Sequence, residues 1–184
     1  MSHDPSRVLV VAATKAEAAY VPDGVPLVLT GIGKVEAAAL TAAAIARSRP
    51  DLVLNIGTAG ALRPGLTGVF LPSTVVNHDL SADAIRALGH DAVDEIGLPD
   101  GDGTVLATGD LFVTDPAARD RIAERAHLVD MEGFAVARAC HLAQVPCRLV
   151  KVVSDAADDS ALEWPAVVDA CARLLGHWLR DELT

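Results

Sequence analysis

Aromatic side chains are scarce in this sequence and make up only 3% of its 184 residues. A hydrophobic core must therefore be built mainly from Ala, Val, Leu and Ile, within the 51% of residues that are hydrophobic. That fraction, together with 22% charged residues, excludes a disordered or fibrous chain. A chain of this length supports one sizeable core. We therefore expect a single domain over residues 1–184.

Basic residues are outnumbered as well, with 15 Lys and Arg against 25 Asp and Glu, and the formal net charge is −10. Such a field repels DNA and anionic membrane surfaces, and no local basic patch offsets it. No apolar run reaches the ~18 residues that a membrane helix needs. We expect neither nucleic acid nor a membrane as a partner.

Cysteine is rare too, and Cys140, Cys147 and Cys171 are widely spaced with no CxxC pair. This pattern favours reduced, buried thiols in a cytoplasmic protein. The start of the chain has no cleavage-site pattern of a signal peptide. The histidines have no metal-ligand spacing. We expect no metal and no cofactor.

Apolar runs alternate with helical patterns along most of the chain. The runs that predict strands buried on both faces are Arg7–Ala13, Pro26–Thr30, Leu52–Asn55, Thr104–Thr108, His127–Met131 and Cys147–Ser154. Helices are predicted at Lys34–Arg47, Pro116–Ala126, Gly133–Gln144 and Trp164–Leu183. The alternation predicts an α/β fold in which helices flank a central mixed, largely parallel sheet.

The segment 64–102 is rich in Gly, Pro and Asp and has weaker periodicity. We interpret it as strands and a long loop within the same domain.

Two glycine-containing stretches follow predicted strands. "TGIGKVEAA" fits neither common phosphate motif, because a dinucleotide fingerprint needs glycine at Glu36 and a P-loop needs a hydroxyl residue at Val35. "NIGTAGAL" places small residues where a ligand could approach the backbone closely, although a plain turn from strand to loop explains it equally well.

Three acidic residues stand where predicted strands end or helices begin, namely Glu17, Glu132 and Asp155. Each alone has an ordinary explanation as a solvated or helix-capping residue. If the strands run the same way, however, the three carboxylates face one cleft. Spaced carboxylates suit cleavage of a glycosidic bond, because one protonates the leaving group while another activates water.

The order of "AATKAEA", "TGIGKVEAA", "NIGTAGAL", "TGDLFV", "VDMEGFAVA" and "VVSDAAD" resembles the nucleoside phosphorylase and nucleosidase superfamily. The likeness is greatest to 5′-methylthioadenosine/S-adenosylhomocysteine nucleosidases and futalosine hydrolases. It implies a nucleoside phosphorylase-like fold, hydrolysis of a purine nucleoside, no cofactor and a homodimer.

The resemblance also implies roles for individual residues. Asp155 would protonate the purine N7 with the help of Ser154, and Glu17 would activate the attacking water. Glu132 would hold the ribose hydroxyls beside Met131. The remaining implied contacts are Phe112 and Val113 at the base, Thr58, Ala59 and Gly60 near the sugar, and Ile32 and Trp164 near the 5′ substituent.

Two alternatives remain open: a phosphate-dependent phosphorylase, and a nucleoside-binding protein without turnover. Asn55 stands where phosphorylases of this superfamily carry an arginine, and neutral Asn cannot replace a bidentate guanidinium. This favours water as the nucleophile, while Lys15 and Arg63 lie nearby in sequence. Thr14 replaces a methionine that is frequent in methylthioadenosine-type relatives, and residues 78–103, including His78 near the expected cleft, match poorly.

Overall fold

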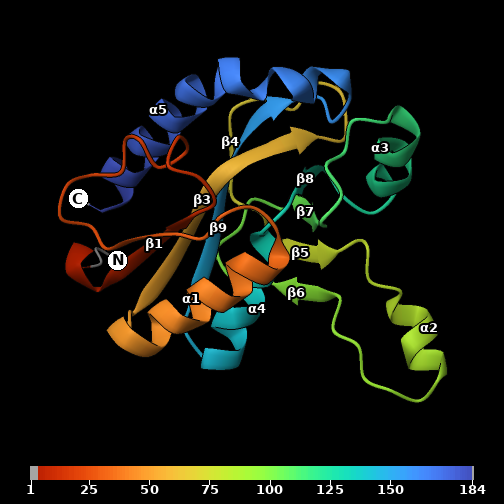
Figure 1. Cartoon of the computed structure of the whole chain (residues 1–184), viewed down its shortest axis with the longest axis horizontal. Coiled ribbons are helices and arrows are strands. Elements are labelled where there is room, and N and C mark those ends of the chain that lie inside the picture. The colour runs from red at the N-terminus through yellow and green to blue at the C-terminus, as the bar shows by residue number, and fades with distance from the viewer. Residues whose placement is uncertain (1–3, 184) are drawn as a thin grey trace.

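A nine-stranded mixed sheet forms the centre of the computed structural model, which describes residues 4–183 (Figure 1). The strands are β1 (Val8–Ala12), β2 (Leu27–Leu29), β3 (Leu52–Ala61), β4 (Val69–Phe70), β5 (Thr74–Asn77), β6 (Glu95–Gly97), β7 (Val105–Thr108), β8 (Leu128–Asp130) and β9 (Cys147–Asp155). They follow the order β2-β1-β3-β8-β7-β5-β6, and β9 pairs with both β3 and β4. The predicted α/β architecture is confirmed.

Parallel pairs predominate in this sheet, as predicted. The pairs β1–β2, β1–β3, β3–β9, β5–β7 and β7–β8 are parallel, whereas β3–β8, β4–β9 and β5–β6 are antiparallel. The long strand β3 joins the two halves of the sheet, because its first part pairs with β1, its end pairs with β8, and β9 pairs along most of its length.

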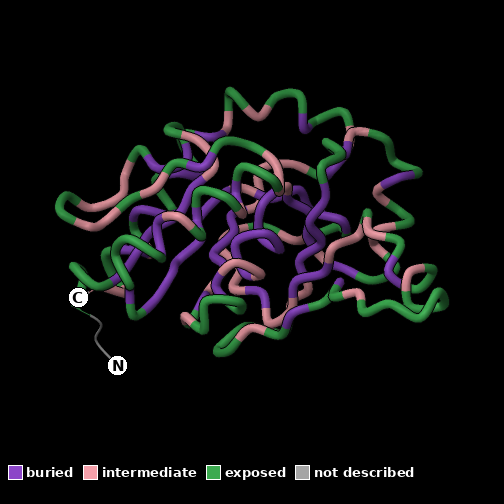
Figure 2. Tube along the Cα trace, turned by 60° about the horizontal axis from the view of Figure 1, so that its bottom comes forward, coloured by how far each residue is buried: buried purple, intermediate pink, exposed green. Residues whose placement is uncertain are grey.

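Strand β1 is buried on both faces, which is what its unbroken apolar run predicts. Val8, Val10 and Ala12 pack in the cluster that includes helix α5 (Trp164–Glu182). The intervening side chains, Leu9 and Val11, pack toward α1 (Lys34–Ser48) and α4 (Gly133–Ala143). The buried part of the chain therefore runs through the middle of the molecule, between two helical layers (Figure 2).

Helix α3 (Pro116–Ala123) covers a third apolar cluster beside β5, β7 and β8. Its start follows the sequence rule, since the Asp115 side chain accepts hydrogen bonds from the amides of Ala117 and Ala118 and proline stands next. The four predicted helices are thus present, each ending within three residues of its predicted end.

Helix α2 (Ala82–Ala87) was not predicted. It is six residues long and lies on an arm that extends from the body of the molecule (Figure 1). Only Ala82 in it is buried, so the sequence carries no apolar periodicity from which to predict it. The strands expected within residues 64–102 are present as β4, β5 and β6.

The prediction that the third strand ends at Asn55 was wrong, because β3 continues through "NIGTAG" to Ala61. Glycine weakens a strand by its conformational freedom, which is why the sequence indicates a turn here. Pairing along β9, from Val53–Cys147 to Gly60–Asp155, holds this glycine-containing part of β3 extended. Register shifts between Ala59 and Gly60, near the end of both strands.

We predict that Gly176→Ala destabilises the fold, although alanine normally favours a helix. A Cβ atom at Gly176 in α5 would lie 2.6 Å from the Tyr20 backbone oxygen. Relief of this overlap costs about 1–3 kcal/mol, more than the helix propensity gained. Chemical denaturation measures the loss, with exposed His177→Ala as the neighbouring control. Unchanged stability of Gly176→Ala would contradict the packing described here.

Candidate active site

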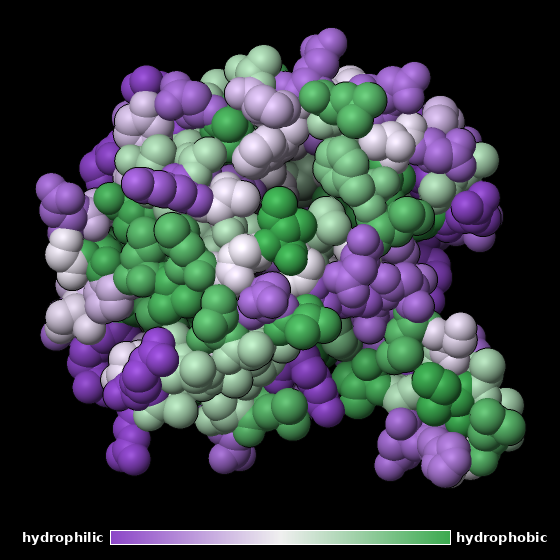
Figure 3. All heavy atoms as spheres, in the orientation of Figure 1, coloured by the Kyte–Doolittle hydropathy of each residue, from purple (hydrophilic) through white to green (hydrophobic). Residues whose placement is uncertain are grey.

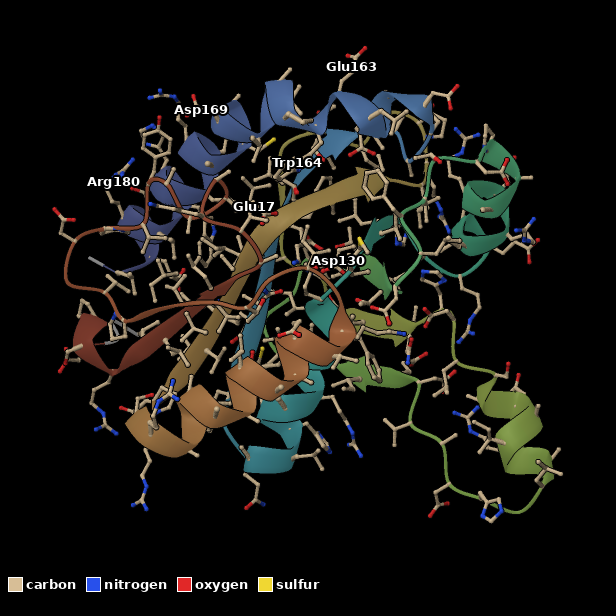
Figure 4. The ribbon with its side chains drawn as sticks, viewed as in Figure 1. Glu17, Asp130, Glu163, Trp164, Asp169 and Arg180 are labelled. Atoms are coloured by element: carbon tan, nitrogen blue, oxygen red, sulfur yellow. The ribbon has the colours of Figure 1, made fainter. Side chains whose placement is uncertain are left out.

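A cavity of about 490 Å³ lies where strands β3, β8 and β9 end, between the 13–17 turn and the start of α5. Every residue that the sequence analysis singled out for the site lines it: Glu17, Ile32, Thr58, Ala59, Gly60, Phe112, Val113, Met131, Glu132, Ser154, Asp155 and Trp164. Figure 4 shows Glu17, Trp164 and Asp130 inside the molecule beside β3, whereas Glu163, Asp169 and Arg180 lie along α5.

Glu17 is held by four hydrogen bonds and is only 5% exposed. Its Oε1 accepts from the amide and hydroxyl of Thr58, at 2.8 and 2.9 Å, and its Oε2 accepts from those of Thr14, at 3.1 and 2.8 Å. Thr14, which departs from the methionine frequent in similar proteins, therefore orients the carboxylate. The four bonds offset the cost of burying its charge.

Trp164 reaches across the cavity from the start of α5. Its indole Nε1 donates to Thr58 Oγ1 at 2.9 Å, and the same hydroxyl donates to Glu17. This hydrogen bond connects the first turn of α5 to β3 at the cavity.

A buried ion pair between Lys151 and Asp130, which was not predicted from the sequence, lies beside the cavity. Lys151 Nζ lies 2.9 Å from Asp130 Oδ2, and both side chains are 1% exposed. Asp130 also accepts from the Gly133 amide at 2.8 Å and from the Thr108 hydroxyl at 2.5 Å. The available signal was a lysine inside the apolar run of β9, because a charge there requires a buried partner.

Glu132 lies close to the charges of Asp130 and Lys151. Its Oε1 accepts from the Gly33 amide at 2.8 Å. Burial, followed by the neighbouring charge of Asp130, raises its pKa from 4.5 to about 7, although Lys151 and the Gly33 bond act in the opposite direction. Glu132 therefore changes protonation near neutral pH, within reach of a ligand in the cavity.

Asp155 is the last residue of β9 and pairs with Gly60 of β3, which also pairs with Val129 of β8. Its Oδ1 accepts from the Ala157 amide at 2.8 Å, and the Ser154 hydroxyl donates to Oδ2 at 2.7 Å. The local turn and the neighbouring serine thus orient this carboxyl group.

The small residues of β3 make room for these side chains. A Cβ atom at Gly57 would lie 3.1 Å from Glu17 Oε1 and 3.3 Å from Lys151 Nζ, and one at Gly60 would lie 2.9 Å from Asp155 Oδ1. From the sequence, "NIGTAG" could be either a place where a ligand approaches the backbone or a plain turn. In the structure these two glycines let the side chains of Glu17, Lys151 and Asp155 approach the strand closely.

The two glycines of "TGIGK" allow the chain to turn between β2 and α1. Gly31 and Gly33 have φ values of 82° and 98°, which lie in the region that favours glycine. The amides that a phosphate motif would offer to an anion are already bonded, since Gly33 donates to Glu132 and Lys34 donates to Asp110 at 2.8 Å. This agrees with the failure of both motif tests.

Several residues considered near the site lie elsewhere. Asn55 is 1% exposed inside the sheet, where its Nδ2 donates to the Val11 carbonyl, so it does not line the cavity. Lys15 is exposed, Arg63 donates to the Ala123 carbonyl, and His78 lines a separate, smaller cavity.

The lining includes eight residues that the sequence analysis did not assign: Ala13, Thr14, Leu111, Val129, Asp130, Ala161, Leu162 and Pro165. Four carboxylates line the cavity in all, Glu17, Asp130, Glu132 and Asp155, and no lysine or arginine of the described residues does so. The remaining lining is largely apolar. The site therefore suits a ligand with hydroxyl and ring nitrogen groups, and it does not suit a free anion.

Comparison with protein-family models shows the family of this chain. The family model described as the phosphorylase superfamily matches residues 18–101 and 83–177. The chain belongs to this superfamily. A member from Anoxybacillus flavithermus, a 5′-methylthioadenosine/S-adenosylhomocysteine nucleosidase, is 32% identical over 73% of this chain and 70% of its own. One of the same name from Bacillus cereus is 30% identical over 79% and 74%.

Solved structures of the superfamily share the fold. The Helicobacter pylori 5′-methylthioadenosine/S-adenosylhomocysteine nucleosidase superposes with a TM-score of 0.85 at 21% identity, covering 98% of this chain and 99% of that one. Native futalosine hydrolase from the same species gives 0.84 at 21% identity, covering 96% of each chain. Within residues 4–183, no helix is long and apolar enough to cross a membrane.

We predict that Glu132→Gln raises stability at pH 8 while it flattens the dependence of stability on pH. The folded protein retains the Glu132 proton up to about pH 7, whereas the unfolded chain loses it near 4.5. The stabilisation that protonated Glu132 contributes is therefore fully present below pH 4.5 and is lost as the pH rises through 7. Removing the charge should raise the free energy of unfolding by on the order of 1–3 kcal/mol at pH 8.

Urea denaturation between pH 4.5 and 8 measures this effect. Glu95→Gln, at an exposed position in β6, is the matched control and should follow the wild-type profile. A parallel profile for Glu132→Gln would mean that Glu132 does not hold the proton.

Proposed function

We propose that this protein hydrolyses the N-glycosidic bond of a purine nucleoside and releases the free base and the sugar. The observation that carries the proposal is the cavity at the ends of β3, β8 and β9, in which Glu17, Glu132 and Asp155 meet and which no basic side chain of the described residues lines. The nucleosidase names of relatives at 30–32% identity support the same reaction.

In the proposed reaction, Asp155 donates a proton to N7 of the purine as the bond between the base nitrogen and the sugar carbon breaks. The bonding electron pair leaves with the base, and positive charge develops on the sugar ring. Ser154 and the Ala157 amide fix the carboxyl group for this transfer.

Glu17 accepts a proton from the water that attacks the sugar carbon. Its four lone-pair positions are occupied by two amides and two hydroxyls, and the amides are fixed by the backbone. The attacking water therefore replaces the hydroxyl of Thr14 or Thr58 as a donor. Glu132, beside Met131, holds the ribose hydroxyls, so that the sugar lies between the two glutamates.

The base would pack on Phe112 and bond to the backbone at Val113. Among the described residues, the backbone of Leu111, Phe112 and Val113 makes no hydrogen bond within the protein, which leaves these groups available to a ligand. Ile32, Leu162 and Trp164 give the cavity an apolar side, which suits an uncharged 5′ substituent such as methylthio.

Water is favoured over phosphate as the nucleophile for an electrostatic reason. A phosphate dianion in this cavity would meet four acidic side chains without a paired cation from the described residues. The buried ammonium of Lys151 is already bonded to Asp130. Bound phosphate would therefore lie at high energy.

The chain would act as one domain, in the cytoplasm, and as a homodimer. Apolar side chains at the cavity rim, including Ile32 and Leu162, are 59% and 67% exposed, and Leu88 on the α2 arm is 77% exposed. Figure 3 shows apolar surface on this arm at lower right. A second copy covering these side chains would remove them from water. Light scattering should give twice the chain mass, and a monomer would rule out the dimer.

The reaction is tested by incubating the protein with methylthioadenosine, S-adenosylhomocysteine, futalosine, adenosine and inosine, each with and without phosphate. We expect free base and free sugar at rates independent of phosphate, and methylthioadenosine as the better substrate. Sugar 1-phosphate among the products would identify a phosphorylase. Nucleoside binding without any product would identify a binding protein.

We predict that Asp155→Asn lowers kcat by about 10²–10⁴-fold, because the amide cannot donate the proton. The Ala157 bond survives in this variant, since an amide oxygen accepts it equally well. The measurement is steady-state turnover, with exposed Asp91→Asn as the control. Near-normal turnover in a folded Asp155→Asn would remove Asp155 from the mechanism.

A further inference from the structure

The loop that carries Phe112 has few attachments of its own. It connects β7 to α3, and the backbone of residues 111–113 makes no hydrogen bond within the described part of the chain. Leu111 and Phe112 are half-exposed or more. Val113 is buried in the third apolar cluster and holds one end of the loop, and Asp110, immediately before Leu111, provides the hydrogen bonds that hold the other end.

Asp110 is fixed from two sides. Its amide donates to Asp79 Oδ2 at 2.8 Å, and its own Oδ1 accepts from the Lys34 amide at 2.8 Å. Its Oδ2 lies 3.7 Å from Lys34 Nζ. Both attachments involve Lys34, because the Lys34 ammonium also pairs with Asp79 Oδ1.

Lys34 stands at the junction of three segments. It is the first residue of α1, and its side chain is 19% exposed. Its ammonium bonds Asn77 Oδ1 at 3.0 Å at the end of β5 and pairs with Asp79 at the base of the α2 arm. One cation thereby offsets two carboxylates, Asp79 and Asp110, that would otherwise repel each other. The ammonium accordingly lowers the pKa of Asp79, against the effect of burial.

The same helix start also holds the residue proposed for the sugar. Gly33 donates its amide to Glu132, and the next amide, that of Lys34, donates to Asp110. Two successive amides therefore fix the spacing between Glu132 and the Phe112 loop. A side chain that secures the second attachment controls where the base lies relative to the ribose.

We propose that Lys34 is a positioning residue for base recognition: through Asp79 and Asp110 it holds the 110–113 loop against the ligand without touching the ligand itself. This inference rests on the proposed function, because it takes the 110–113 loop as the base-binding element. Lys34 does not line the cavity, so its effect is transmitted by Asp110.

Lys34→Met tests the proposal, since methionine keeps the backbone amide and much of the side-chain volume. We expect KM for methylthioadenosine to rise about tenfold, with kcat within about threefold of wild type, because base binding weakens while the carboxylates remain in place. Lys34→Arg should restore KM because it retains the charge. Arg47→Met, an exposed cation on the same helix, is the control and should leave both constants unchanged.

Asp79→Asn supplies the second arm of a double-mutant cycle. If Lys34 acts through Asp79, the KM of Lys34→Met/Asp79→Asn should equal that of the worse single variant. If the fold-increases in KM of the two single variants multiply in the double variant, the proposal is wrong. It is also wrong if KM is unchanged in Lys34→Met, or if thermal stability is lost with kinetics preserved, since that result would make Lys34 merely structural.

Binding of free adenine and hypoxanthine, measured by calorimetry, separates this proposal from the proposed function. If the wild type binds a base but turns over no nucleoside, the hydrolase assignment fails, and a tenfold weaker affinity in Lys34→Met still supports the positioning role. If the wild type turns over nucleoside and Lys34→Met binds both bases normally, the positioning role fails alone.

Discussion

The ion pair between Lys151 and Asp130 is the interaction on which the site depends. Four acidic side chains line one cavity, and the buried ammonium of Lys151 contacts one of them, Asp130. Its charge acts on Asp130, Glu132 and Glu17 together. Without it, burial and the charge of Asp130 would raise the pKa of Glu132 further, because Lys151 lowers that pKa. The electrostatics of this cluster thus influence when Glu132 ionises.

The sheet brings that ammonium and the carboxylates together. Strand β3 pairs with β9, which carries Lys151 and Asp155, and its end pairs with β8, which leads to Asp130 and Glu132. Because β8 runs antiparallel to β3, the convergence does not arise from uniformly parallel strands. It arises because β3 is long enough to reach both halves of the sheet, and the absence of side chains at Gly57 and Gly60 leaves space for Glu17 and Asp155.

Much of this could be predicted from the sequence, for identifiable reasons. Continuous apolar runs such as that of β1 indicate strands buried on both faces, and acidic residues at strand ends, such as Asp155, indicate a site. Interactions between distant segments could not be predicted. The ion pair of Lys151 was not predicted, because Lys151 lies within an apolar strand and its partner Asp130 lies 21 positions earlier in the chain. The extension of β3 and the short α2 also depend on tertiary pairing that local propensity opposes or does not encode.

The bond between the Trp164 indole and the Thr58 hydroxyl gives the protein a built-in optical probe. The chain has two tryptophans, and the other, Trp178, packs on the apolar cluster beneath α5. Only Trp164 lines the cavity, and its ring nitrogen is bonded to the hydroxyl that serves Glu17. A molecule that enters the cavity changes the polarity around this indole alone. The emission spectrum of the native chain therefore reports occupancy without an attached dye.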